Sequence, residues 1–234
     1  IDTVLVVTGL DGDFNPRRLE RYLVLVSASG AAPVVVLTKI DRCEEADALR
    51  ARLADIEGGG VPVVAINAKD ADSAAALAPW LGGGRTVVLV GSSGAGKSTL
   101  TNTLLGRSRM RTAAVRERDS RGRHTTTHRA LMTLPLGACL IDTPGMRELK
   151  LTGEEDVADQ VFEDIEQLAA GCRFRDCRHD AEPGCAVRAA LEAGVLEPGR
   201  FNNHRKLQDE RAAAAKVLAA RQNAPQGRPR GPRR

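Results

Sequence analysis

The chain has 234 residues, of which 42% are hydrophobic and 27% charged, enough for one or two domains with packed cores. Its aromatic residues are four Phe, one Trp and one Tyr, which argues against a protein that binds nucleic acid mainly by stacking bases on aromatic side chains. The net charge of the chain is +4, but residues 107–129 carry +6 and residues 223–234 carry +4. The remaining residues therefore carry a net charge of −6. Two basic segments on an acidic body suggest a polyanionic partner; a solvated loop and a solvated tail are the alternative.

No apolar run approaches the roughly 18–20 residues of a membrane span, and no segment resembling a secretory signal opens the chain. The sequence starts at Ile1, already inside an apolar run, so we expect further residues upstream. These features predict a cytoplasmic protein with no membrane partner.

Short apolar runs alternate with helical patterns over the first half. Strands are predicted at 4–8, 33–38, 61–67 and 86–91, and helices at 16–27, 44–57, 73–81 and 97–105. Strands that are apolar on both faces and separated by helices indicate a parallel sheet covered on both sides. A polar loop over 107–128 precedes strands at 129–134 and 138–142, which the short link 135–137 joins as a hairpin. These six strands complete a domain over residues 1–153.

The pattern changes after residue 153. Helices are predicted at 156–170, 186–193 and 198–221, around a cysteine-rich segment at 172–185. They form a second, small domain over 154–222. Residues 223–234 consist mainly of Gln, Pro, Gly and Arg without apolar periodicity, which predicts a disordered basic tail.

A phosphate-binding loop follows the strand at 86–91. The pattern G-x-x-x-x-G-K-[ST] occurs between a predicted strand and a predicted helix, where its mechanism requires it. Glycines allow backbone N–H groups to curl around a β-phosphate, the lysine neutralises β- and γ-oxygens, and the following serine coordinates Mg²⁺. The nucleotide-binding residues predicted here are Gly91, Ser92, Ser93, Gly94, Ala95, Gly96, Lys97, Ser98 and Thr99. A glycine-rich turn without ligand is the structural alternative.

Two segments that follow predicted strands, at 38–41 and 67–69, are expected to recognise the base of the nucleotide. Asp41 can accept hydrogen bonds from the two donors of guanine, a pair that adenine lacks, so it disfavours an ATP-dependent protein. The stem of Lys39 can lie over the ring, and the segment after the next strand can present a backbone N–H to the guanine O6. An Asp after a strand is more often a helix cap, but the motifs together predict guanine binding by Thr38, Lys39, Ile40, Asp41, Asn67, Ala68 and Lys69.

The segment Asp142-Thr143-Pro144-Gly145 completes the nucleotide site. Asp142 can hold magnesium through water, and the Gly145 N–H can contact the γ-phosphate. In the loop at 107–128, Thr125 or Thr126 is expected to bind the same Mg²⁺ that Ser98 binds. The base-reading segments precede the phosphate loop, which indicates a circularly permuted Ras-like domain.

Cys172, Cys177, His179 and Cys185 form a C-x₄-C-x-H-x₅-C pattern. Three thiolates and one imidazole are a ligand set for one structural Zn²⁺ per chain. Buried thiols or a disulfide are the alternative, and a cytosolic protein rarely keeps a disulfide. Cys43 and Cys139 lie outside the pattern and are expected to be small core residues.

The permuted series TKID, NAK, GSSGAGKST, RGRHTTTH and DTPG, followed by CRFRDCRHDAEPGC, closely resembles the RsgA (YjeQ) family. The resemblance extends over residues 1–222. It implies a permuted Ras-like P-loop GTPase domain with a six-stranded, mostly parallel sheet, followed by a small helical zinc domain. It also implies a monomeric late maturation factor of the small (30S) ribosomal subunit that contacts 16S rRNA and whose GTP hydrolysis the subunit stimulates. The family's N-terminal RNA-binding OB-fold has no counterpart in this sequence.

The sequence departs from common GTPases at the position after Gly145. Met146 stands where Ras-like enzymes place a water-orienting Gln, and a thioether cannot hold a water in that way. The resemblance and the chemistry both indicate His124 as the hydrolytic group, against the alternatives of a surface histidine and of His128. Because the Gln is missing, a second function remains as an alternative to a GTPase: a GTP-gated rRNA-binding module with negligible turnover.

Overall fold

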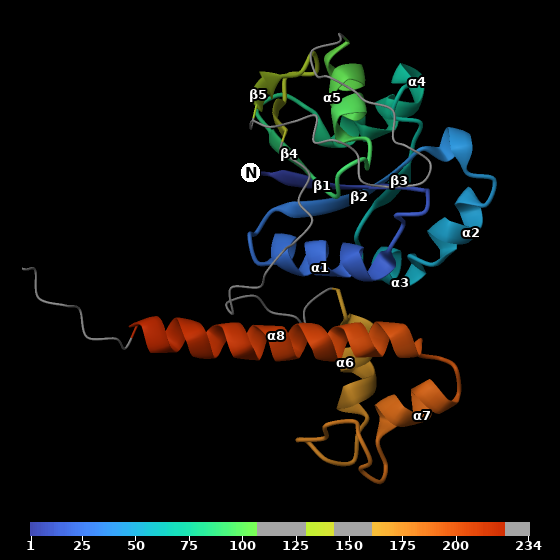
Figure 1. The fold of residues 1–234 in the computed structure, drawn as a ribbon, viewed down its shortest axis with the longest axis vertical. Coiled ribbons are helices and arrows are strands. Elements are labelled where there is room, and N and C mark those ends of the chain that lie inside the picture. Colours follow the sequence, from blue (N-terminus) through green and yellow to red (C-terminus); the bar gives the residue numbers. More distant parts are fainter. Residues whose placement is uncertain (107–129, 143–160, 223–234) are drawn as a thin grey trace, which may run out of the picture.

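The computed structural model describes residues 1–106, 130–142 and 161–222. Within these residues, a sheet with helices on both faces makes up one part of the molecule, and three helices with their connecting loops make up the other (Figure 1). The boundary predicted at residue 153 and the tail predicted at 223–234 lie outside the described residues, so both stay predictions.

The sheet has six strands in the order β3-β2-β1-β4-β6-β5. All neighbouring strands pair in parallel except β5 and β6, which form the predicted antiparallel hairpin. The mostly parallel six-stranded sheet is therefore confirmed. The strands are β1 (Thr3–Gly9), β2 (Ala32–Thr38), β3 (Val63–Ala65), β4 (Thr86–Val90), β5 (Ala130–Thr133) and β6 (Cys139–Asp142).

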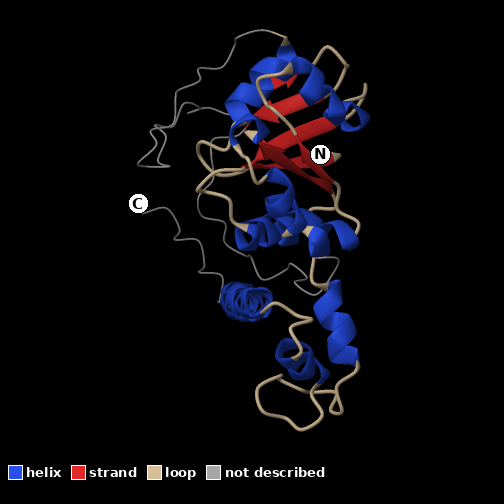
Figure 2. Ribbon diagram, turned by 90° about the vertical axis from the view of Figure 1, so that its right-hand side faces the viewer, coloured by secondary structure: helices blue, strands red, loops and turns tan. Residues whose placement is uncertain are grey.

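Burial on both faces explains why the strands consist of nearly continuous apolar residues. All seven residues of β1 are buried, and alternate residues belong to different cores. Val4 and Val6 pack in one core, on the side of α1 (Pro16–Ser27), whereas Leu5 and Val7 pack in the other. Figure 2 shows helices on both sides of the sheet.

The position of β4 in the sheet shows how a circularly permuted chain can form this fold. It is fourth in the sequence but central in the sheet, with β1 on one side and β6 on the other. The strands that precede β4 along the chain therefore occupy one half of the sheet, and those that follow it occupy the other. The same sheet would form from a chain opened elsewhere.

Two predicted helices have a different form. The helix predicted at 44–57 is divided into α2 (Ala46–Ala51) and α3 (Ala54–Gly58), and the 3₁₀ helix η1 (Ile40–Arg42) precedes it. The division lies at the fully buried Leu53, whose N–H donates to the carbonyl of Arg50 three residues earlier, at 2.8 Å, in a tight turn. The helix predicted at 73–81 is α4 (Ala71–Ala74) followed by the 3₁₀ helix η2 (Ala75–Trp80), which contains Pro79, a residue without an N–H for a regular helix. Helix α5 (Lys97–Leu105) has its predicted bounds.

The other part of the molecule consists of α6 (Glu163–Ala170), α7 (Ala186–Glu192) and α8 (Pro198–Gln222). Residues 156–160 of the predicted helix at 156–170 lie outside the described residues. Helix α8 lies beneath α1 (Figure 1), and Arg21 of α1 forms an ion pair of 2.7 Å with Glu210 of α8. Among the described residues, none of the helices has the length and hydropathy required to cross a membrane.

Candidate functional site

The phosphate-binding loop connects β4 to α5 and needs glycine for steric reasons. A Cβ at Gly91 would lie 2.1 Å from the carbonyl oxygen of Val7 in the neighbouring β1. Gly94 and Gly96 have φ angles of 82° and 97°, in the left-handed region that other residues rarely adopt. The glycines of the motif therefore stand at the positions where the loop backbone requires glycine.

Lys97, the lysine of the motif, is buried within this loop. It is 7% exposed, and its Nζ donates to the carbonyls of Gly91 at 2.9 Å and Ser92 at 2.8 Å. The ammonium is thus held by the loop that, in P-loop proteins, surrounds nucleotide phosphates.

The end of β2 is tied directly to the phosphate loop. The side chain of Thr38 is fully buried, and its hydroxyl donates to the carbonyl of Ala95 at 2.6 Å. Lys39 follows with a φ of 67°, and its ammonium forms an ion pair with Asp11. Thr38 therefore fixes the predicted base-reading segment against the predicted phosphate segment.

The two predicted base-reading segments also meet each other. Asp41 Oδ2 lies 3.7 Å from the Nζ of Lys69. The Lys69 N–H donates to Asn67 Oδ1 at 3.1 Å, and the Asn67 N–H donates to Ser73 Oγ at 2.9 Å. Segments that are 26 positions apart in the sequence, as counted between Asn67 and Asp41, thus converge at the carboxyl ends of parallel strands, where α/β proteins bind ligands.

Two contacts of this site have no signal in the sequence. The Ser92 hydroxyl donates to Asp13 at 2.7 Å, and the Thr103 hydroxyl donates to the Ala68 carbonyl at 2.7 Å. Each joins a motif to a segment that carries no recognised pattern, so only the tertiary structure identifies Asp13 and Thr103 as supports.

The predicted magnesium ligands are described only in part. Ser98 lies in the first turn of α5, and the register of β4 with β6 places the backbone of Asp142 opposite Leu89, near the end of β4. His124, Thr125, Thr126 and Gly145 lie outside the described residues, so their roles stay predictions.

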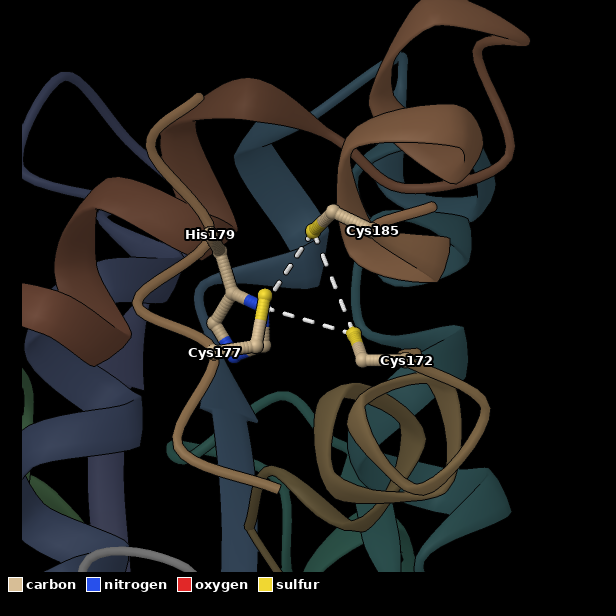
Figure 3. A group of neighbouring side chains, drawn as sticks. All are labelled: Cys172, Cys177, His179 and Cys185. Atoms are coloured by element: carbon tan, nitrogen blue, oxygen red, sulfur yellow. Dashed lines mark hydrogen bonds between the residues drawn. The ribbon is translucent and has the colours of Figure 1, made fainter. Parts of the chain in front are cut away.

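The three cysteines and the histidine predicted as metal ligands converge in one cluster (Figure 3). Their ligand atoms all lie within 4.8 Å of one another. Cys172 Sγ is 3.9 Å from Cys185 Sγ, and His179 Nδ1 is 3.6 Å from Cys172 Sγ and 3.4 Å from Cys185 Sγ. Standard bond lengths around a tetrahedral zinc imply about 3.8 Å between sulfurs and about 3.5 Å from sulfur to nitrogen. The cluster can hold a metal ion.

Local structure positions the four side chains. Cys172 follows α6 and Cys185 caps the N-terminus of α7, where its Sγ accepts from the Arg188 N–H at 3.4 Å. Burial opposes ionisation of Cys172, but backbone N–H groups at the start of α7 outweigh it and lower the pKa of this thiol. Burial raises the pKa of Cys177 to about 11. His179 has a φ of 61° and packs edge-on against Phe201.

The sequence of the sheet part matches a known family. The model of the RsgA GTPase family matches residues 1–152. The chain belongs to the RsgA GTPase family. Its resemblance to that family is thereby confirmed, and the P-loop and the base-reading segments all lie within the matched residues.

Curated relatives and solved structures agree with this assignment. The chain is 68% identical over 221 residues to the small ribosomal subunit biogenesis GTPase RsgA of Xanthomonas euvesicatoria and 67% identical to that of Xanthomonas oryzae. These matches cover 94% of the chain but 61% of each relative. The crystal structure of YjeQ from Thermotoga maritima matches at 28% identity with a TM-score of 0.64, covering 88% of this chain and 70% of YjeQ. YloQ, described as a circularly permuted GTPase, matches at 29% identity with a TM-score of 0.61, covering 89% and 68%. The expected permuted fold is confirmed.

Proposed function

We propose that this RsgA family chain binds GTP and GDP and hydrolyses GTP. The observation that carries the proposal is the convergence of three motifs at one edge of the sheet. The buried Lys97 lies in the phosphate loop, Thr38 joins that loop to β2, and Asp41 meets Lys69 at the ends of β2 and β3.

The base would be read by Asp41. Its carboxylate would accept from the two donors on one edge of guanine, while the stem of Lys39 would cover the ring. The 3.7 Å contact of Asp41 with Lys69 supports this arrangement because it brings the carboxylate next to the segment that follows β3. Adenine offers no matching pair of donors, so the site would favour guanine.

Hydrolysis would use residues around the γ-phosphate. Ser98, Asp142 and one of Thr125 and Thr126 would hold Mg²⁺, which in such sites neutralises charge on the β- and γ-phosphates. The Gly145 N–H would contact the γ-phosphate. His124 would orient the attacking water or accept its proton, because Met146 cannot.

The proposed partner is the small ribosomal subunit. The curated relatives are named for its biogenesis, and the basic segments at 107–129 and 223–234 suit the phosphates of 16S rRNA. We propose a late maturation role for a monomer in the cytoplasm, where the subunits mature, with hydrolysis stimulated by the subunit.

The metal of the cysteine cluster is proposed to be zinc. Three thiolates with one imidazole are typical of a closed structural zinc site, and the separations among Cys172 Sγ, His179 Nδ1 and Cys185 Sγ are close to those around a tetrahedral zinc.

A multiple-turnover GTPase assay with and without purified small subunits tests the main proposal. We expect slow turnover alone, faster turnover with subunits, and no turnover in Lys97→Ala. Binding of GTP and of subunits without turnover in either condition would instead favour a GTP-gated rRNA-binding module. ATP that competes as well as GTP would contradict the proposed guanine site.

A further inference from the structure

The segment 172–185, called here the cysteine loop, carries an exposed aromatic ring. Phe174 is 41% exposed, although aromatic residues are rare in this chain. The guanidinium carbon of Arg173 lies 5.5 Å from the centre of the Phe174 ring. A planar ring supported by a guanidinium offers a surface on which another planar group can stack.

Phe174 forms one wall of a cavity. The cavity has a volume of about 540 Å³ and lies among the cysteine loop, α6 and α8. This volume lies within the range of roughly 300–1,000 Å³ that is typical of small-molecule sites. The walls combine an aromatic surface with cationic and polar groups, among them Phe174, Phe201, Arg175, Arg178, His204 and Gln208. Three acids (Glu166, Asp180 and Asp209) and the metal-binding Cys177 and His179 also line the cavity.

Some charged side chains of this cavity have an ion-pair partner and others do not. Asp180 pairs with Arg205 at 2.8 Å, and Glu166 lies 3.4 Å from His204 Nε2. Arg175 and Arg178 are exposed, and neither forms an ion pair with a carboxylate among the described residues. Asp209, on the α8 side of the cavity, also has no ion pair among those residues, so the two arginines outnumber the unpaired acid. Their guanidinium groups can therefore bind an anion, and phosphate suits guanidinium geometry well.

We propose that this cavity binds one unpaired nucleotide of single-stranded RNA. The base stacks on Phe174, and the adjacent phosphates lie against Arg175 and Arg178. An acidic peptide could use the two arginines but would leave the exposed ring unused, so we favour RNA. The inference rests on the proposed function, because a partner rich in RNA is what the small subunit provides.

The position of the cysteine loop is compatible with a second binding site. In Figure 1 the loop lies at the end of the helical part that is farthest from the sheet. The P-loop lies between β4 and α5, within the sheet part. A nucleotide of RNA held at the cysteine loop would therefore leave the GTP site accessible.

The experiment uses a five-nucleotide RNA with 2-aminopurine at its centre, because stacking quenches the fluorescence of this base. The basic segments at 107–129 and 223–234 also attract RNA, so a local reporter is needed. We expect the wild-type chain to quench the fluorescence. Phe174→Ala should weaken the quenched complex by about five- to fifty-fold, the scale of one lost base–aromatic stack. Phe174→Trp should retain quenching, and the exposed Val195→Ala should serve as the matched control.

A second variant tests the phosphate contacts without touching the ring. Arg175→Ala should reduce the slope of log K against log salt by about 0.7, the value for one phosphate contact with a single strand. Arg188→Ala, at a partly exposed arginine of α7 outside the cavity, should leave the slope unchanged.

Two outcomes would overturn the inference: quenching that survives in Phe174→Ala, or equal affinity for duplex RNA of the same length. GTP binding and turnover are measured separately on the same samples. A chain that quenches but does not turn over GTP would contradict the proposed function alone, whereas a GTPase without quenching would contradict only this inference.

Discussion

Arg200 of α8 and Glu20 of α1 form an ion pair at the junction between the helical part and the sheet part of the molecule. Nη1 of Arg200 lies 2.9 Å from Oε1 of Glu20, and the two side chains are 2% and 1% exposed. Arg200 also donates to both carboxylate oxygens of Asp164, at 2.8 and 2.6 Å, and to the Val161 carbonyl at 2.7 Å. Asn203 donates to the second oxygen of Glu20, at 2.5 Å. The pair is thus a hydrogen-bonded network that holds α8 on α1.

Removal of the arginine should destabilise the protein strongly. Arg200→Met removes the buried arginine beside Glu20 and leaves only the partly exposed Arg17 to pair with its carboxylate, so we expect the free energy of unfolding to fall by up to about 3–5 kcal/mol. Arg188→Met removes an exposed pair with Glu192 and should cost less than about 1 kcal/mol. Urea titration measures both. Equal midpoints and slopes for the two variants would show that the buried pair does not stabilise the junction.

The same pair predicts a dependence of stability on pH. Burial raises the pKa of Glu20 above its ordinary 4.5, although Arg17 and Arg200 oppose the shift. The folded protein therefore binds this proton more tightly than the unfolded chain, so the contribution of Glu20 is fully present below about pH 4.5 and declines as the pH rises through its folded pKa. Relative to Glu20→Gln, which does not titrate, the wild type should lose stability over that interval.

Asn203→Ala provides the matched comparison for this pH series. It removes a hydrogen bond that lowers the pKa of Glu20, so its free energy of unfolding should depend on pH more steeply than that of the wild type. The free energy of unfolding is measured at half-unit pH steps for the wild type, Glu20→Gln and Asn203→Ala. Parallel curves for all three proteins would contradict the prediction.

Guanine specificity should depend on Asp41. Asp41→Asn should weaken GTP binding by about 1–3 kcal/mol, because hydrogen bonds to a charged group are lost, and should improve binding of xanthosine triphosphate, whose O2 can accept from the amide. Asp47→Asn, at an exposed position of α2, is the control. Competition binding with GTP, ATP and xanthosine triphosphate measures the preference, and an unchanged preference in Asp41→Asn would exclude the residue from base recognition.

Zinc should be present at one ion per chain and should stabilise the helical part. Metal binding by Cys172, Cys177, His179 and Cys185 contributes free energy to the folded state, so chelation should increase hydrogen exchange over residues 161–222. Binding of GTP should change little, since the P-loop belongs to the sheet part. Metal analysis of protein purified without chelator tests the stoichiometry; chains that are mostly metal-free yet equally protected would contradict a structural ion.

His124→Ala should separate binding from hydrolysis. An imidazole that orients or deprotonates water contributes roughly 10²–10⁴-fold to a rate, so turnover stimulated by the subunit should fall by that factor. GTP affinity and cosedimentation with small subunits should stay as in the wild type. His128→Ala is the control, and stimulated turnover within a few-fold of wild type in His124→Ala would assign the chemistry to another group.

The sequence by itself determined the features that depend on local patterns. The P-loop, the hairpin of β5 and β6, the bounds of α1 and α5 and the spacing of the four metal-binding residues could be predicted because a short segment carries its own steric or chemical requirement. Gly94 and Gly96 show the reason, since their φ angles of 82° and 97° lie in the left-handed region that favours glycine.

Only the tertiary structure decided how those segments are held. The division at Leu53 follows from its burial against the sheet, where packing overrides helical periodicity. The Thr38 hydroxyl and Asp13 contact the P-loop across 57 and 79 positions, and Glu20 meets Arg200 across 180. In the sequence, Glu20 is one charged residue of an amphipathic helix, indistinguishable from residues that face solvent. Its role arises because α8 covers that face of α1, and hydrogen bonds between distant segments leave no periodic pattern in the chain.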